Sequence, residues 1–204
     1  MQFKRLFNDF IEMKYFFIFA MFIFMFGIHA GWYDSFQVSS YMEDQLKSLK
    51  GISEFINNKE NPQMWLILVI FINNTIKGVL VIFLGVAFGV IPLIMLSTNG
   101  LLLGYVLSLE TNLSVWELIL KGIIPHGIIE IPAIWIACAY GIKLGFLFTM
   151  SIIHKLLPRL GVEAWNDFKK TIQLTKTLAV CLTVCFGIAA VIESTISYWL
   201  MKNL

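Results

Sequence analysis

Long apolar runs, separated by polar stretches, make up most of the chain. The first run covers residues 15–32. The basic residues Lys4, Arg5 and Lys14 precede it. A transmembrane helix needs about 20 mostly apolar residues, whereas a signal peptide has a shorter apolar core followed by a small-residue cleavage site. The pattern therefore predicts a retained first transmembrane helix, with the basic residues 1–14 in the cytoplasm.

The second apolar run, residues 64–97, follows a polar stretch at residues 33–63 in which acidic residues outnumber basic ones. This excess of acid agrees with an extracytoplasmic loop. At about 1.5 Å per residue the run is too long for one straight crossing. We expect residues 64–74 to form an interfacial helix and residues 75–97 to span the membrane. The alternative is two crossings, with a turn at the asparagine pair inside the run.

Three further crossings are predicted after the second run. Residues 99–124 open on a turn signal and hold two apolar halves, each too short to span, so we expect a broken or re-entrant span. Residues 126–150 form the next span. Residues 151–177 are rich in lysine and hold Trp and Phe, which favours a cytoplasmic amphipathic segment on the membrane surface. Residues 178–201 form the last span.

The parity of these segments predicts the topology. Both the N-terminus and the basic segment after the fourth span are expected in the cytoplasm, so an even number of crossings separates them. The broken span must then count as a full crossing. The result is an all-α, polytopic membrane protein with about five crossings, its N-terminus in the cytoplasm and its C-terminus outside.

Composition supports this class and narrows the partners. The chain is 58% hydrophobic and 14% charged, with a mean hydropathy of +0.80, whereas soluble domains are about 45–50% apolar. We therefore expect a single membrane domain, residues 1–204, in the plasma (inner) membrane, in contact with lipids and other membrane proteins. A net charge of +2 without a basic-aromatic groove argues against a nucleic-acid partner. The three cysteines lie in apolar stretches and indicate packing residues rather than ligands.

A segment with two ionisable residues between apolar flanks is the strongest candidate for chemistry. Pro125 suits the first position of a helix, and His126 and Glu130 then share one face. Pro132 cannot donate a backbone hydrogen bond and should kink this helix one turn later. An ionisable pair at membrane depth is costly. We therefore predict a buried polar site here.

Other polar residues in apolar stretches are candidates for the same intramembrane site: Asn73, Asn74, Asn99, Glu110 and Glu193. We expect His126, Glu130 and one of the two adjacent asparagines to converge. His126 and Glu130 also form a candidate metal pair, which needs a third ligand from another helix. The alternatives are structural: the asparagines join helices, Glu110 lies in a solvated turn, and His126 only bonds Glu130 and caps the helix.

Small residues at helical spacing predict close packing between helices. One face of the 126–150 helix carries four of them, and one face of the second apolar run, residues 64–97, carries three glycines. These residues are Ala133, Ala137, Gly141 and Gly145, and Gly78, Gly85 and Gly89. We expect the two faces to pack against each other. Packing of the same faces between two copies, giving a homodimer, is the alternative.

The assembled pattern resembles the stage II sporulation protein M family over roughly residues 10–200. The resemblance rests on the asparagine pair before a glycine-rich stretch, on Asn99-Gly100 with Gly104, and on Pro-His-Gly-x-x-Glu at residues 125–130. The chain resembles the wider family that carries this motif more than it resembles the founding sporulation protein. Relatives occur beside peptidoglycan-degrading machinery, transporter subunits and clusters that make circular bacteriocins. The resemblance implies a multipass membrane component of a larger assembly.

Three functions fit these observations. The first is a scaffold that gathers partner proteins in the membrane and presents a polar intramembrane site to them. The second is a transport or export component, for instance for a peptide, because broken helices and midplane polar residues line substrate pathways. The third is an intramembrane metal-dependent hydrolase or peptide ligase that uses His126 and Glu130. No His-Glu-x-x-His or Gly-x-Ser-x-Gly motif supports this third function.

Overall fold

The structure is a computed structural model that describes residues 2–33, 39, 44, 47, 51–52, 54–109, 124–157 and 164–197. These residues contain helices and no strand, which confirms the all-α class. The helices are α1 (Gln2–Glu12), α2 (Lys14–Tyr33), α4 (Pro62–Leu84), α5 (Val90–Ser108), α7 (Ile124–Leu156) and α8 (Ala164–Ile192), and a π-helical turn, η3 (Glu193–Ser197), extends α8.

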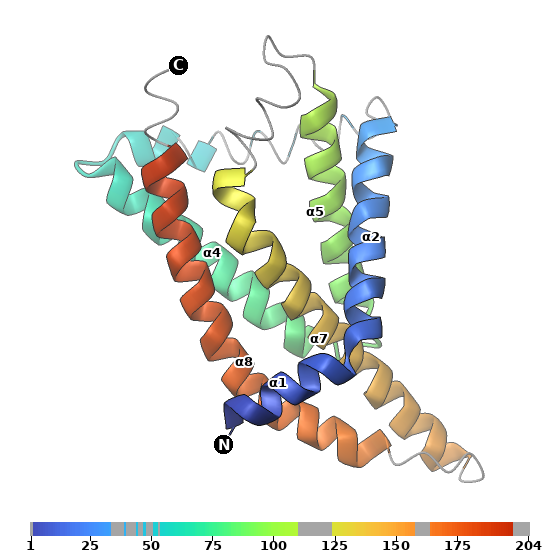
Figure 1. The fold of residues 1–204 in the computed structure, drawn as a ribbon. Helices are drawn as coiled ribbons and strands as arrows, with labels where there is room; N and C mark the ends of the chain where they lie inside the picture. Colours follow the sequence, from blue (N-terminus) through green and yellow to red (C-terminus); the bar gives the residue numbers. More distant parts are fainter. Residues whose placement is uncertain are drawn as a thin grey trace.

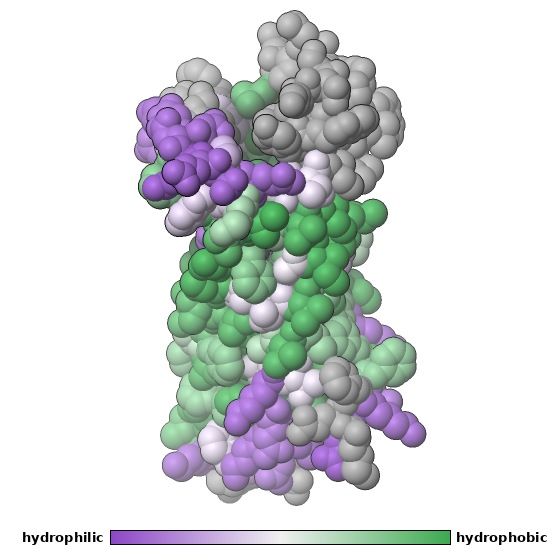
Figure 2. Space-filling model, turned by 90° about the vertical axis from the view of Figure 1, so that its left-hand side faces the viewer, coloured by the Kyte–Doolittle hydropathy of each residue, from purple (hydrophilic) through white to green (hydrophobic). Residues whose placement is uncertain are grey.

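Five of these helices, α2, α4, α5, α7 and α8, are long and apolar enough to cross a membrane. This count confirms the predicted number of spans within the described part of the chain. Successive spans run in opposite directions, and α1 lies at the end where α7 finishes and α8 begins (Figure 1). Figure 2 shows an apolar middle band with hydrophilic residues gathered at both ends.

The second apolar run is divided differently from the prediction. Helix α4 continues through the asparagine pair, and the chain turns at residues 85–89 instead of spanning as 75–97. Asn73 Nδ2 donates to Asn74 Oδ1 at 3.2 Å, so these side chains bond each other without breaking the helix. Gly89 supplies the turn with a φ of 74°, a conformation in which glycine is free of steric penalty. The predicted interfacial helix and the first part of the predicted second span therefore form one crossing, α4. The last residues of that predicted span, 90–97, belong to the next crossing, α5.

The predicted broken span at 99–124 also begins inside a continuous helix. Helix α5 passes through Asn99 unbroken, and Asn99 Nδ2 donates to the carbonyl oxygen of Met95 at 2.7 Å. Thr98 Oγ1 donates to the carbonyl oxygen of Ile94 at 2.9 Å. These polar side chains thus bond the preceding turn of their own helix, so they do not start a turn. Residues 110–123 of the predicted span lie outside the described residues.

The basic segment 151–177 does not form a separate surface helix. Helix α7 ends at Leu156, and residues 164–177 are the first half of α8, continuous with the last span. Phe168, Thr171 and Thr175 are buried against the bundle, so this half of α8 has packing of its own. At about 1.5 Å per residue α7 is roughly 50 Å long and α8 roughly 44 Å, both longer than the ~30 Å hydrocarbon core. Their charged ends therefore extend beyond it.

Among the described residues, helices α2 and α5 form the most extensive helix pair. Each contributes two glycines to the contact, Gly27 and Gly31 from α2 and Gly100 and Gly104 from α5. A Cβ at Gly27 would lie 2.7 Å from the carbonyl oxygen of Ser97, and a Cβ at Gly104 would collide with that of Ile28. Only glycine permits this approach of two backbones.

The paired helices join the rest of the bundle through α7. Phe24 of α2 packs edge-on against Trp135, with ring centroids 5.3 Å apart, and Phe16 packs against Phe146. The fully buried Leu96 of α5 belongs to the same core cluster. Helix α7 is therefore the central element, with α2 and α5 on one side and α4 and α8 on the other (Figure 1).

Candidate functional site

Polar residues on α4, α7 and η3 lie between the middle of the bundle and the end away from α1. Asn74 of α4 is buried, and Glu130 of α7 and Glu193 of η3 are half-buried. Turn η3 packs against both α4 and α7. A π-helical turn is uncommon and frequently marks a functional position. Both carboxylates make polar or electrostatic contacts, so neither is without a partner.

The register of α4 and α7 places Asn74 and Glu130 at similar depth. The two helices run in the same direction (Figure 1). Gly85, at the end of α4, packs directly on Gly141. Asn74 precedes Gly85 by 11 residues and Glu130 precedes Gly141 by 11 residues (85 − 74 and 141 − 130). Both therefore lie about 16 Å along their helices from this contact.

The adjacent Asn73 lies on a different face of α4 from Asn74. Asn73 is exposed on the outer face of α4, and so is Lys77 one turn further along. Ile76 and Leu80, 52% and 50% exposed, surround them with apolar surface. The asparagine pair is therefore shared between the interior and the outer face of the bundle, and only Asn74 lies inside.

The remaining sequence-predicted residues do not join this group in the described structure. Asn99 is bonded within its own helix. The backbone of His126 lies in the first turn of α7, but its side chain is outside the described part of the chain, as is Glu110. Among the described residues no group of three or more His, Cys, Asp or Glu side chains is arranged to hold a metal. The metal pair of His126 and Glu130 stays a prediction.

The predicted small-residue face of α7 packs inside the chain. Ala133 and Ala137 are buried. Gly145 would collide with Gly85 and Gly89 if it carried a Cβ, and a Cβ at Gly141 would lie 2.6 Å from Pro92 Cγ. Gly78 instead meets the ring of Phe186 on α8. These glycine faces are consequently covered by the protein's own helices.

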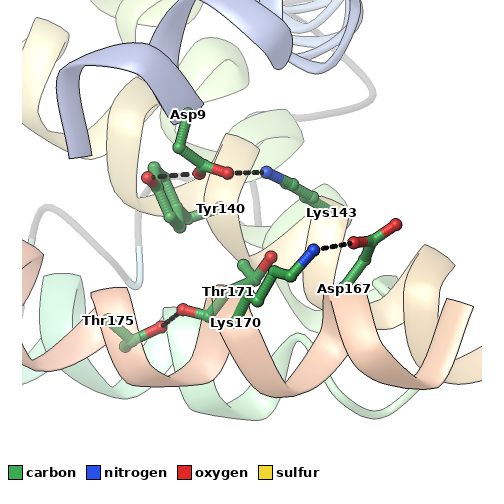
Figure 3. A network of polar contacts seen from close by, with 7 residues as sticks. All are labelled: Asp9, Tyr140, Lys143, Asp167, Lys170, Thr171 and Thr175. Atoms are coloured by element: carbon green, nitrogen blue, oxygen red, sulfur yellow. Dashed lines mark hydrogen bonds and ion pairs between the residues drawn. The ribbon is translucent and has the colours of Figure 1, made fainter. Parts of the chain in front are cut away.

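A buried ionic network at the opposite end was not found from the sequence. Asp9 of α1 accepts a hydrogen bond from Tyr140 Oη at 2.6 Å and pairs with Lys143 Nζ at 2.5 Å (Figure 3). The side chains of Lys143 and Asp9 are only 11% and 13% exposed. An ionisable residue inside an apolar run was the available signal, and Lys143 meets that criterion as well as Glu130 does.

Comparison with known proteins agrees with the membrane architecture. An uncharacterized protein of Methanocaldococcus jannaschii is 29% identical to this chain over 146 residues, which are 71% of this chain. They are 61% of that relative, so the chain spans less than two thirds of its length. No solved structure matches the chain. The profile described as "Stage II sporulation protein M" matches residues 16–198. Because that match covers most of the sequence, the chain belongs to the stage II sporulation protein M family.

Proposed function

We propose that this membrane protein is a scaffold component of a larger assembly and binds a partner transmembrane helix on the outer face of α4. The observation that carries the proposal is the exposure of Asn73 and Lys77 on that face. Lipid tails offer no hydrogen bonds, so a polar side chain in the hydrocarbon favours a polar partner.

Asn73 carries more of this argument than Lys77. A lysine near a helix end can extend its long side chain to the interface, and Lys77 lies seven residues from Leu84 (84 − 77). Asn73 lies eleven residues from both Pro62 and Leu84 (73 − 62 and 84 − 73), and its side chain is too short to reach either interface. Its one hydrogen bond within the described structure goes to Asn74. A carbonyl oxygen and a second N–H therefore remain for a partner.

The chemistry of this face indicates what kind of helix would bind. Asn73 and Lys77 are one turn apart, so a single acceptor side chain on a facing helix can reach both. A carboxylate would pair with the ammonium group and accept from the amide. The small-residue faces support this location indirectly, because they are already covered within the protein, whereas the polar face of α4 is exposed.

In-membrane photo-crosslinking tests the proposal. A photoreactive amino acid at Ile76 lies between Asn73 and Lys77 and leaves both in place. We expect it to crosslink to a protein in the native membrane, and Asn73→Leu with Lys77→Leu to reduce that crosslink severalfold at unchanged expression. The matched control is Val184, which is 57% exposed on α8 and has no polar neighbour of this kind. Crosslinks to lipid alone from position 76, or equal protein crosslinks after both substitutions, would contradict the proposal.

A further inference from the structure

Helix α1 differs from the five spans because it runs across them, near one end of the bundle (Figure 1). We propose that α1 is an interfacial helix whose Phe7 and Ile11 insert into an anionic phospholipid leaflet while Asp9 fastens the helix to α7. This inference is independent of the proposed partner helix, since it concerns another element and another end of the molecule.

The apolar surface of α1 is wider than its contact with the bundle. Leu6 and Met13 are buried, and Phe10 stacks on Phe17 with ring centroids 5.4 Å apart. Phe7 and Ile11 are one turn apart on the neighbouring strip of the helix, and they are 66% and 60% exposed. A helix that only covered the bundle would not need this second apolar strip.

The ionic network fixes the rotation of α1 about its axis. Asp9 faces α7, where Tyr140 and Lys143 hold both of its carboxylate oxygens. At about 100° per residue, Phe7 and Ile11 lie roughly 160° from Asp9 on the helix. Turning them toward the bundle would break both contacts and leave the ammonium of Lys143 buried without its partner. The exposed apolar strip is therefore held away from the bundle.

The position of α1 along the chain places this strip at the membrane surface. Helix α1 ends at Glu12, Met13 forms the bend, and the span α2 begins at Lys14. Exposed apolar residues continue directly onto α2, where Tyr15 and Ile18 are 71% and 63% exposed. Since these α2 side chains belong to a membrane-spanning helix, the strip on α1 adjoins lipid-facing surface.

The charges beside the strip indicate the lipid. Lys4, Arg5 and Lys14 are all exposed on or next to α1, against Glu12 as the exposed acid. Exposed Lys155, Lys169 and Lys170 add to the basic character of the same end. Amphipathic helices with lysine and arginine bordering an apolar face bind anionic phospholipid surfaces through both components.

Site-directed spin labelling of the full chain tests the inference. Single cysteines at positions 7, 11, 8 and 12 would be labelled in a background with Cys181→Ala and Cys185→Ala. Cys138 is retained, because its complete burial protects it from the label. Asn8 and Glu12 are exposed on the polar side of α1 and are the matched controls. The protein is reconstituted in vesicles with equal parts of phosphatidylcholine and phosphatidylglycerol.

We expect labels at 7 and 11 to be accessible to oxygen and shielded from a water-soluble nickel reagent, with the reverse at 8 and 12. Lys4→Ser with Arg5→Ser, or pure phosphatidylcholine vesicles, should move labels 7 and 11 to shallower depth. Nickel access at 7 and 11 equal to that at 8 would overturn the inference. Shielding of 7 and 11 from both reagents would also overturn it, because a protein, for example a second copy, would then cover the strip.

Discussion

One carboxylate holds two side chains of the central helix at the basic end of the molecule. Asp9 contacts Tyr140 and Lys143 with separate oxygens, and both Lys143 and Asp9 are nearly buried. Burying a charge is costly, and a close partner offsets much of the cost. Removing one partner of such a pair is therefore worse than removing both, since the remaining charge stays buried.

Substitution of Asp9 tests this network. Asp9→Asn should lower the free energy of unfolding by about 3 kcal/mol, because Lys143 keeps its charge and loses its counterion. Adding Lys143→Met should recover part of the loss. Thermal unfolding in detergent measures both effects. The control is Asp167→Asn, whose pair with Lys170 at 3.1 Å is mostly exposed and should change stability by less than about 1 kcal/mol (Figure 3). Equal effects at the two sites would contradict the argument.

Single residues also show what a sequence can reveal about a membrane site. The cost of polar groups among apolar ones draws attention to Glu130 and Asn74, and it applies equally to Lys143. It does not reveal a partner such as Asp9, which lies 134 residues away in a stretch that reads as an ordinary basic N-terminus. It also does not distinguish Asn73 from Asn74, because which asparagine faces inward depends on the rotation of α4.

At the scale of helices, number and class were predictable, whereas several boundaries were not. Apolar length indicated the spans, and the structure has five helices suited to crossing. Gly85 and Gly89 are four residues apart, which fits a helical packing face. They do pack on Gly141 and Gly145, but they belong to the turn between α4 and α5 and not to the interior of a helix. Glycine permits both a close helix contact and a tight turn, so spacing alone could not distinguish the two.

The glycine contact between α2 and α5 gives a prediction at this scale. Gly104→Ala places a methyl group against the carbonyl oxygen of Ile28, and the two backbones must separate. We expect a loss of about 1–3 kcal/mol in unfolding free energy, measured by thermal unfolding in detergent. Gly187→Ala is the matched control within a span, because its Cβ would meet the Phe71 ring at an ordinary 3.6 Å. Similar loss in both variants would argue against a close α2–α5 contact.

For the whole molecule, the alternating directions of the five helices predict how the chain sits in the membrane. Helix α1 and the junction of α7 with α8 share one end, and the end of α8 lies at the other (Figure 1). Positively charged residues concentrate at the first of these ends, among them Lys4, Lys155 and Lys169. By the positive-inside rule we predict that this end lies in the cytoplasm.

Reporter fusions measure this orientation. A compartment-sensitive reporter joined after Leu204 should be active outside the cytoplasm, and one inserted at Trp165 should report the cytoplasmic side. The reporter at Trp165 is joined to a chain that ends there, just after the start of α8, so it reports the side reached after α7 without the last span. Only α8 lies between the two fusion points. A cytoplasmic signal from both would mean that α8 does not cross the membrane, which would contradict this arrangement.

The tight pairing of α2 with α5 also has a consequence for synthesis in the cell. Helix α2 is complete at Tyr33 and α5 only at Ser108, 75 residues later (108 − 33). At about 5–20 residues per second, a ribosome needs roughly 4–15 s for that distance. During this interval α5, the partner of the glycine face of α2, is not yet synthesised, and α4 enters the bilayer before it. The most extensive helix contact among the described residues is thus among the later ones to form, and α2 depends on lipid or an insertion factor until α5 arrives.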